Sequence, residues 1–373
     1  MGALEGIRVF EMAGLAPAPY CGLILADFGA EVVRIDRLGA GSMDQLARGK
    51  RSVAVNLKHP DGVASVLRLI EQADVLIEPY RPGVMERLGL GPEIACGRNP
   101  RLVYARLTGW GQTGPYAPMA GHDIDYIAIS GALSAIGRRG DRPLPPINLL
   151  GDFAGGGMLC ALGIALALVE RSRSGRGQVI DSAMVDGAAH LATFLYKFRG
   201  SGMWTDERGT NLLDTGAPFY DTYQTKDGQY VAVGAIEPQF YAALLHGLGL
   251  DPATMPDQLD RAHWPETARR FAEIFATRTR AEWGAIFDGT DACVAPVLGL
   301  GEVQDHPHAR ARGLLIPNER GNLEPAPAPR LSRTPGRVRR PMPRPGQHTR
   351  EVFEEYGFGA DEIQQLTEVG AIG

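Results

Sequence analysis

The start of the chain alternates between short apolar runs and a longer one, and this order constrains the fold more than any other feature of the sequence. Residues 7–12 and 30–35 have the length of buried strands, and residues 20–28 between them have the length and apolar content of a helix. Two parallel strands joined by a helix require a right-handed crossover. The opening therefore predicts a βαβ unit, from which parallel sheets with helices on their faces are built.

Helix-to-strand patterns continue through the first half of the chain. They are expected over residues 61–77 and 84–107, after a strand at 52–57 and before a long helix at 153–171. Three consecutive glycines at 155–157 lie in the first turns of that helix and predict that a neighbour packs or binds closely there. We therefore expect an α/β protein whose large domain, over residues 1–185, is a Rossmann-like open parallel sheet.

The pattern changes in the second half of the chain. Residues 219–224 and 230–234 flank Lys226-Asp227-Gly228, a sequence typical of a β-hairpin, and amphipathic helices are expected at 239–248, 264–277 and 280–287. These elements predict a smaller α+β domain. The expected division after the large domain is a linker at 186–220, the small domain at 221–312, a return linker at 313–324, and a segment at 325–373 that completes the large domain and includes a last helix at 349–356.

The charge balance of the chain excludes a broad nucleic-acid-binding surface. Its 38 lysines and arginines nearly balance 43 aspartates and glutamates, which gives a formal net charge of -5. The four cysteines are scattered, with no CxxC pair and no nearby histidine at metal-ligand spacing. We therefore expect no bound metal and a reducing compartment.

Targeting and membrane patterns are also missing from the sequence. Residues 1–12 lack the basic start and the cleavage site of a signal peptide, and the last three residues, Ala371-Ile372-Gly373, match no peroxisomal or endoplasmic-reticulum signal. The most apolar run, residues 153–169, is shorter than the roughly 20 residues that span a bilayer, so we expect a buried helix. These patterns predict a cytoplasmic protein with no membrane partner.

One glycine-rich segment raises the alternative of a nucleotide-dependent oxidoreductase. Residues 109–114, Gly-Trp-Gly-Gln-Thr-Gly, match the GxGxxG pattern of dinucleotide sites and follow a predicted strand. Pro115 and Pro118 follow at once and discourage the helix that such a site needs. The turn at 14–19, after the first strand, has prolines where the glycines should be. These departures weaken the dinucleotide interpretation.

Basic residues follow or precede several predicted strands and suggest a phosphate-bearing ligand. They are Arg37, Arg48, Lys50, Arg51, Lys58 and Arg81. In an α/β sheet, strand ends that face one crevice bind ligands, and a few arginines and lysines there would suit the pyrophosphate and 3′-phosphate of coenzyme A. The alternative is a set of solvated surface charges.

Three ionisable residues lie at glycine-rich turns that open predicted helices. They are His122 after Gly121, Asp152 after Gly151, and Glu237 in the segment that begins at Gly234. Each is a candidate for acid-base chemistry. By itself, however, a histidine in such a place is more often structural, and an aspartate is more often a helix cap.

Together with several other segments, these turns resemble the α-methylacyl-CoA racemases, a group within the family III CoA-transferase superfamily. The segments are Leu107-Thr108-Gly109-Trp110-Gly111-Gln112-Thr113-Gly114, Gly121-His122-Asp123, Asn148-Leu149-Leu150-Gly151-Asp152-Phe153-Ala154-Gly155-Gly156-Gly157, Gly216-Ala217-Pro218-Phe219-Tyr220, Gly234-Ala235-Ile236-Glu237-Pro238-Gln239-Phe240-Tyr241 and Asp291-Ala292-Cys293. The resemblance therefore covers nearly the whole chain.

The resemblance implies specific roles for these residues. His122 and Asp152 would be the two proton-transfer residues, and Glu237 would orient His122. Contacts to coenzyme A would come from Arg37, Val55, Asn56, Leu57, Lys58, Gly121, Asp123, Ile124, Asp125 and Tyr126. We add Arg81 to these candidates, because it follows a predicted strand. The resemblance also implies an interlocked homodimer with active sites between the subunits.

The implied reaction explains why these residue types are needed. The α-proton of a thioester is weakly acidic, so inversion requires a base on one face, an acid on the other and stabilisation of the enolate oxygen. His122 and Asp152 would supply the pair, with Asp152 kept protonated near neutral pH by burial or a nearby negative charge. Backbone N–H groups that open the helix after His122 would face the thioester oxygen. No metal or redox cofactor is required, since coenzyme A is part of the substrate.

The expected activity is inversion of the α-carbon of 2-methylacyl-CoA thioesters by 1,1-proton transfer. The acyl group is expected on an apolar face formed by Met184, Leu191, Phe194, Leu195 and Met203, although this spacing is also typical of a core. Two alternatives remain beside the oxidoreductase. One is a family III CoA-transferase with Asp152 as nucleophile, and the other is a noncatalytic CoA-binding protein.

Overall fold

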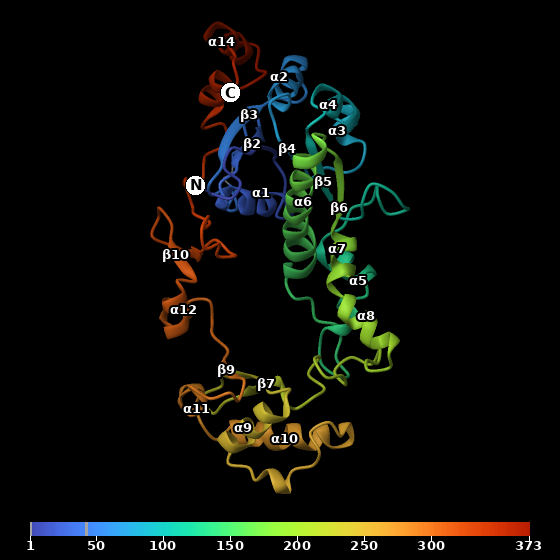
Figure 1. Ribbon diagram of the computed structural model, residues 1–373, viewed down its shortest axis with the longest axis vertical. Helices are drawn as coiled ribbons and strands as arrows, with labels where there is room; N and C mark the ends of the chain where they lie inside the picture. Colours follow the sequence, from blue (N-terminus) through green and yellow to red (C-terminus); the bar gives the residue numbers. More distant parts are fainter. Residues whose placement is uncertain (1, 42–43) are drawn as a thin grey trace. The chain divides into compact units, whose positions relative to one another are not determined.

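The computed structural model describes residues 2–41 and 44–373, which form two compact units (Figure 1). The large unit contains the chain up to Ser130 together with Ile147–Leu191 and Gly313–Gly373, and the small unit contains Gly131–Pro146 and Ala192–Arg312. This division differs from the one expected from the sequence. Residues 131–146 and 192–220 belong to the small unit, whereas residues 186–191 and 313–324 belong to the large unit.

The described part of the large unit is built on a six-stranded parallel sheet with the strand order β3-β2-β1-β4-β5-β6. Its strands are β1 (Arg8–Met12), β2 (Glu31–Arg37), β3 (Arg51–Val55), β4 (Val75–Glu78), β5 (Val103–Thr108) and β6 (Val179–Ala183). Helix α1 (Pro17–Asp27) connects β1 to β2, as the opening of the sequence predicts. The strand order reverses between β1 and β4, and the carboxyl ends of strands at such a point are where open α/β sheets bind ligands.

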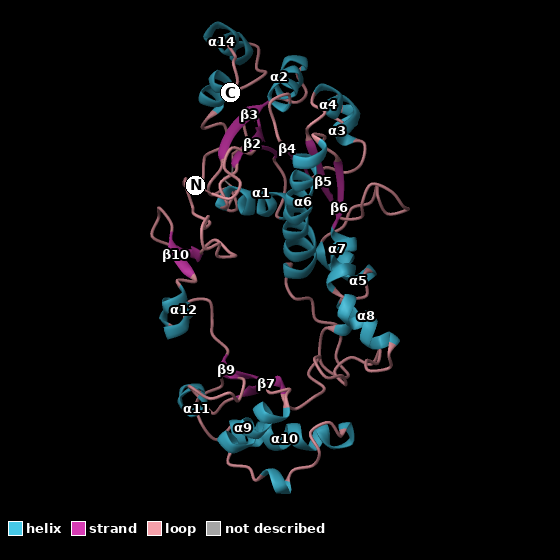
Figure 2. Cartoon of the chain, viewed as in Figure 1, coloured by secondary structure: helices cyan, strands magenta, loops and turns pink. Residues whose placement is uncertain are grey.

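Helices cover both faces of this sheet (Figure 2). One face packs on α1, α5 (Asp123–Ile129) and α6 (Leu159–Ser174), and the other on α2 (Pro60–Ile70), α3 (Val84–Arg87), α4 (Pro92–Arg98), α13 (Thr349–Glu355) and α14 (Ala360–Glu368). Side chains alternate between the two cores, since Val9 of β1 points into the first and Phe10 into the second. The C-terminal helices complete the second core, as expected, but α14 was not predicted from the sequence.

The expected long helix begins earlier than predicted. A π-helix, η2 (Leu149–Met158), continues directly into α6. Its glycines allow close packing: a Cβ atom on Gly155 would lie 2.9 Å from the Ala188 backbone nitrogen, and one on Gly157 would lie 2.6 Å from the Pro17 carbonyl oxygen. Close packing explains the three consecutive glycines.

The joined helix also corrects the membrane argument made from the sequence. Leu149–Ser174 is 26 residues long and, among the described residues, is the one helix long and apolar enough to cross a membrane by length and composition. One such helix is weak evidence, because core helices pass the same test. Only 39% of its most apolar 18-residue stretch is buried. The helix is therefore buried on one side and not all round.

The small unit has a three-stranded antiparallel sheet within residues 192–312, in the order β7-β8-β9. It consists of β7 (Tyr220–Gln224), β8 (Tyr230–Gly234) and β9 (Val294–Pro296), and its helices are α8 (Thr193–Gly200), α9 (Pro238–Leu248), α10 (Trp264–Phe275), α11 (Arg280–Phe287) and α12 (Pro307–Arg312). The hairpin and the three amphipathic helices expected from the sequence are confirmed. Phe219, Phe271 and Trp283 are fully or almost fully buried in their shared core.

Short elements connect these parts. They are α7 (Met184–Leu191), the antiparallel pair β10 (Leu315–Pro317) and β11 (Leu323–Pro325), and the 3-10 turns η1 (Leu133–Ala135), η3 (Pro252–Thr254), η4 (Arg261–His263) and η5 (Val303–Asp305).

Candidate active site

A cavity of about 450 Å³ opens at the carboxyl ends of β1, β4 and β5 in the large unit. It lies at the reversal of strand order, where the fold predicts a ligand site. The loops that follow these strands form its walls. They contribute Gly14, Leu15, Pro79, Tyr80, Arg81, Pro82, Thr108, Gly109 and Trp110, and the remaining walls include Met119, Gly121, His122, Tyr126, Asp152 and Met184. Both proton-transfer residues expected from the sequence therefore line one cavity.

His122 is held at the start of α5 with its side chain exposed. Its backbone N–H donates to Asp125 Oδ2 at 2.9 Å, so the carboxylate caps the first turn of the helix. Tyr126 anchors the same turn, because its hydroxyl donates to the Gly121 carbonyl and its ring packs edge-on against Trp110 with centroids 4.8 Å apart. Burial raises the pKa of Tyr126 to about 12. The turn that presents His122 is therefore fixed from both sides.

Asp152 lies in the first turn of the π-helix η2 and is half-buried. Burial raises the pKa of its carboxyl above the ordinary aspartate value, and the negative charge of Asp123 adds to the rise. A hydrogen bond from Asn148 Nδ2 at 3.1 Å and the charge of His122 act in the opposite direction. The carboxyl holds a proton at higher pH than a solvated aspartate does, as an acid in this place needs.

Asp123 follows His122 directly, but its side chain turns away from solvent. It is 4% exposed, and its Oδ2 accepts hydrogen bonds from the backbone N–H groups of Gly151, at 2.5 Å, and Asp152, at 2.7 Å. Oδ1 of Asp123 is buried without a hydrogen-bond partner among the described residues. Sequence reasoning treated Asp123 as a contact to coenzyme A and missed this connection, which no local pattern reveals.

The other expected contacts to coenzyme A lie at the carboxyl edge of the sheet. Arg37 ends β2, Lys58 follows the end of β3, Arg81 follows β4, and all three are exposed. Arg81, Gly121 and Tyr126 line the cavity, whereas the lining does not include Arg37, Val55, Asn56, Leu57, Lys58, Ile124 and Asp125. Val55 is buried, and Asn56 Nδ2 donates to the Gly370 carbonyl at 3.1 Å.

Three of the basic residues grouped with these in the sequence are occupied by carboxylates. Arg48, Lys50 and Arg51 lie at or before the amino end of β3, are absent from the cavity lining, and are all buried. Lys50 Nζ pairs with Glu11 Oε2 at 2.6 Å, Arg48 pairs with Asp27 at 2.7 Å, and Arg51 pairs with Glu355 at 2.6 Å. Their charges are neutralised inside the fold. Because β3 has only five residues, the positions of these basic residues in the sequence did not show which of them lie at its amino end and which at its carboxyl end.

The remaining candidates are divided between the two units. Glu237 is the N-cap residue of α9 in the small unit, is exposed, and contributes with burial to raising the pKa of the Cys293 thiol. The expected apolar face is split as well. Met184 lines the large-unit cavity and Leu191 ends that part of the unit, whereas Phe194, Leu195 and Met203 belong to the small unit.

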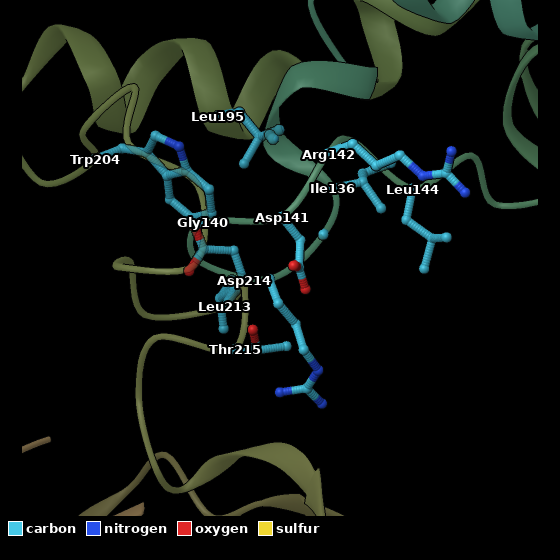
Figure 3. Close-up of a pocket in the computed structure, with 13 residues that line it drawn as sticks. Ile136, Gly140, Asp141, Arg142, Leu144, Leu195, Trp204, Leu213, Asp214 and Thr215 are labelled. Atoms are coloured by element: carbon cyan, nitrogen blue, oxygen red, sulfur yellow. The ribbon is translucent and has the colours of Figure 1, made fainter. Parts of the chain in front are cut away.

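The small unit has a cavity of its own, of about 900 Å³ (Figure 3). Leu195, Trp204 and Leu213 line it together with the loop from Ala135 to Leu144. Figure 3 also places Asp214 on this wall. Its carboxylate accepts the backbone N–H groups of Gly209 and Asn211 at 2.9 and 2.7 Å, which indicates a structural role for this acid. Within residues 2–41 and 44–373, no three His, Cys, Asp or Glu side chains are grouped to hold a metal ion.

Comparison with known proteins gives three similarities. A family model described as CoA-transferase family III matches residues 4–349. Proteins described as alpha-methylacyl-CoA racemase are 57% identical over 364 residues in Mus musculus, covering 97% of this chain and 96% of the relative, and 54% identical over 366 residues in Homo sapiens, covering 98% and 96%. The crystal structure of a CAIB/BAIF family protein from Brucella suis superposes with a TM-score of 0.81 at 25% identity, covering 95% of this chain and 99% of that one.

Proposed function

The chain belongs to the CoA-transferase family III, and on this premise we propose that it is an isomerase that racemises α-methylacyl-CoA thioesters. One observation carries the proposal: a single cavity at the switch point of the sheet is lined by His122 and Asp152. A histidine and a carboxyl with a raised pKa are suited to exchange one proton across a planar intermediate.

In the proposed reaction, neutral His122 removes the α-proton from one epimer, and protonated Asp152 donates a proton to the opposite face of the enolate. The reverse direction exchanges the two roles. The N–H groups of Asp123 and Ile124, the first two of α5, precede the first intrahelical hydrogen bond and are suited to the enolate oxygen. We propose no metal or redox cofactor, because proton transfer requires neither.

Coenzyme A is proposed to lie along the carboxyl edge of the sheet. Exposed cations at three strand ends, Arg37, Lys58 and Arg81, support this path because they can meet the phosphates of the ligand. The segments 55–58 and 121–126 would contribute mainly backbone contacts, since Val55 and Asp123 are buried. The acyl group would extend from the wall at Met184.

We also propose a homodimer in which a second copy completes the site. An apolar stripe on α6 and the preceding turn supports this: Met158, Leu162, Leu166 and Val169 are 52, 54, 60 and 53% exposed and recur at helical spacing. Glu237 from a small unit would then orient His122. Light scattering should give twice the chain mass, and Leu162→Glu with Leu166→Glu should give a monomer; a monomeric wild type would contradict the proposal.

CoA transfer is the second candidate, since the family includes it. Asp152 is the acid in the cavity that would attack the thioester carbonyl, with release of the CoA thiolate and formation of an acyl anhydride. The raised pKa of Asp152 disfavours a free carboxylate, so the geometry supports racemisation better.

One experiment separates the candidates. An enantiopure 2-methylacyl-CoA is incubated with the protein in deuterated water, with and without an acceptor carboxylic acid, and without added nucleotide or metal. Racemisation yields both epimers with deuterium at the α-carbon in either condition. Transfer would instead move coenzyme A to the acceptor while the optical purity of the starting acyl group is kept, and that result would overturn the proposal.

A further inference from the structure

The side chain of Asp123 joins the two segments that carry the proton-transfer residues. Asp123 is the residue after His122, and its Oδ2 accepts the backbone N–H of Asp152 at 2.7 Å and that of Gly151 at 2.5 Å. Gly151 and Asp152 follow Asp123 by 28 and 29 positions in the chain. One carboxylate oxygen therefore fixes the start of the Asp152 helix to the start of the His122 helix.

The surroundings of this carboxylate fit a connection and not a ligand contact. The side chain is 4% exposed and is not part of the cavity wall. A Cβ atom on Gly151 would lie 2.6 Å from Asp123 Oδ2, so any larger residue there would displace the carboxylate. Hydrogen bonds to a charged acceptor are short and strong, and a carboxylate is favoured at the first N–H groups of a helix.

Asp152 is thereby held by two contacts of different kinds. Its backbone is fixed by Asp123, and its side-chain Oδ2 accepts a hydrogen bond from Asn148 one turn earlier, at 3.1 Å. Glycine packing of η2 against α1 and α7 fixes the helix beyond the connection. Among these contacts, the one from Asp123 fixes the position of Asp152 relative to His122.

We propose that Asp123 is a positioning residue, whose buried carboxylate sets the separation and orientation of His122 and Asp152 by joining their two helices. The proposal rests on the proposed racemisation, since it assigns Asp123 to the geometry of that proton transfer. It also replaces the expectation that the Asp123 side chain contacts coenzyme A.

The same carboxylate acts on Asp152 through its charge. After burial, the charge of Asp123 is the next contribution that raises the pKa of Asp152, and His122 opposes it. Tyr126, on the next turn of α5, lies within electrostatic range of Asp152 and of Arg81. Asp123 and His122 act on Asp152 directly, whereas Arg81 and Asp125 act on Tyr126.

Two substitutions separate position from charge. Asp123→Ala removes both hydrogen bonds and is expected to lower kcat about 100-fold while KM for the thioester changes less than about threefold, because a small misplacement of a catalytic group acts on the chemical step. Asp123→Asn keeps an acceptor oxygen and should retain kcat within about tenfold of wild type. In the direction in which protonated Asp152 donates, loss of the charge should move the alkaline limb of the pH profile to lower pH, because the pKa of Asp152 falls.

Asp74→Ala is the matched control. Asp74 also accepts a backbone N–H from a distant segment, that of Arg8 at 2.8 Å, and it pairs with Arg171 at the amino edge of the sheet. Its loss should lower Tm while kcat of the folded protein stays within about twofold. A drop in kcat equal to that of Asp123→Ala would reduce Asp123 to a general structural role and overturn the proposal.

Amide hydrogen exchange distinguishes failure of this proposal from failure of the proposed function. In full-length protein, Asp123→Ala should speed exchange in a peptide containing Gly151 and Asp152, and Asp123→Asn should restore most of the protection. Unchanged exchange, or a raised KM with unchanged kcat, overturns the positioning role in an active racemase. A wild type that racemises no 2-methylacyl-CoA, yet shows the expected exchange, overturns the function and leaves the connection between the helices intact.

Discussion

The two ends of the same parallel sheet use cations in opposite ways. At and before the amino end of β3, Lys50 is 0% exposed and pairs with Glu11, and Arg51 is 2% exposed and pairs with carboxylates from other elements. At the carboxyl ends, Arg37, Lys58 and Arg81 are exposed, and Arg81 lines the candidate active site. Residues of one type therefore stabilise the fold at one end and remain available to a ligand at the other.

The cations at the two ends differ because those at one end are buried and those at the other are exposed. Lys50 Nζ also donates to the Pro19 carbonyl of α1, and Arg51 pairs with Glu351 of α13, so both buried charges are paired inside the protein. The carboxyl ends meet at the reversal of strand order and leave a cavity. The comparison predicts that substitutions at the first end change stability and that substitutions at the second change substrate affinity.

The largest effect is expected for Lys50→Ala. Removing this lysine leaves Glu11 buried with the more distant Arg34, whose nearest nitrogen lies 3.4 Å from it. Breaking a buried pair in this way destabilises by about 3–5 kcal/mol. Lys58→Ala, at the other end of β3, should change the free energy of unfolding by less than about 0.5 kcal/mol. Denaturant unfolding of both variants measures the contrast.

A double substitution sharpens this test. Replacing both members of the buried pair, as Glu11→Leu with Lys50→Met, should recover part of the stability lost in Lys50→Ala, because no unpaired charge then remains. Equal destabilisation by Lys50→Ala and Lys58→Ala would show that the two ends of the sheet do not differ in the way proposed.

An intermediate effect is expected for Arg37→Ala at the carboxyl edge. Loss of a contact to a remote phosphate removes binding that is equal in the ground and transition states, so KM for acyl-CoA should rise about tenfold with little change in kcat. Arg98→Ala is the control, because Arg98 is an exposed arginine that pairs with Glu71 and lies before the amino end of β5. Its KM should equal that of wild type. Steady-state kinetics would contradict the account if Arg37→Ala lost kcat and kept KM.

The smallest effect concerns stability and pH at the active site. Because burial raises the folded-state pKa of Asp152, its stabilising contribution is complete below the ordinary aspartate pKa of about 3.9 and is lost as pH rises through the raised value. Asp152→Asn should therefore raise Tm at pH 7 on the order of 1 °C, a gain that disappears in acid.

Asp206→Asn is a control of opposite sign. The hydrogen bond from Arg199 lowers the pKa of Asp206, so its contribution is present above the ordinary aspartate value and is lost as pH falls. Thermal unfolding at several pH values should show no rise in Tm for this variant. A lower Tm for Asp152→Asn at pH 7 would contradict the direction assigned to Asp152.

The sequence predicts the elements whose pattern is local. The opening βαβ unit, the hairpin around Asp227-Gly228 and the helices of the small unit are confirmed, because each is encoded by apolar spacing and turn residues within a short segment. The two proton-transfer candidates share a cavity, which the family resemblance implied and their pattern at helix starts alone did not.

What could not be predicted depends on partners far away in the chain. Lys50 and Lys58 look alike in the sequence, and only the pairing of Lys50 with Glu11, 39 positions away, distinguishes them. The Arg51 pair with Glu355 spans 304 positions. The resemblance implied that Asp123 contacts coenzyme A, yet its side chain accepts the backbone N–H groups of Gly151 and Asp152. Long-range contacts of this kind have no local signature.

Deuterium exchange by single-base variants tests the central claim most directly. If His122 and Asp152 serve opposite faces, each inversion needs both, so His122→Ala and Asp152→Ala should both lose racemisation, by about 100-fold to 10,000-fold. Each variant is expected to exchange the α-proton of one epimer only, with retained configuration, and the two variants should prefer opposite epimers. Exchange of the same epimer by both, or racemisation near the wild-type rate by either, would contradict the assignment of one base to each face.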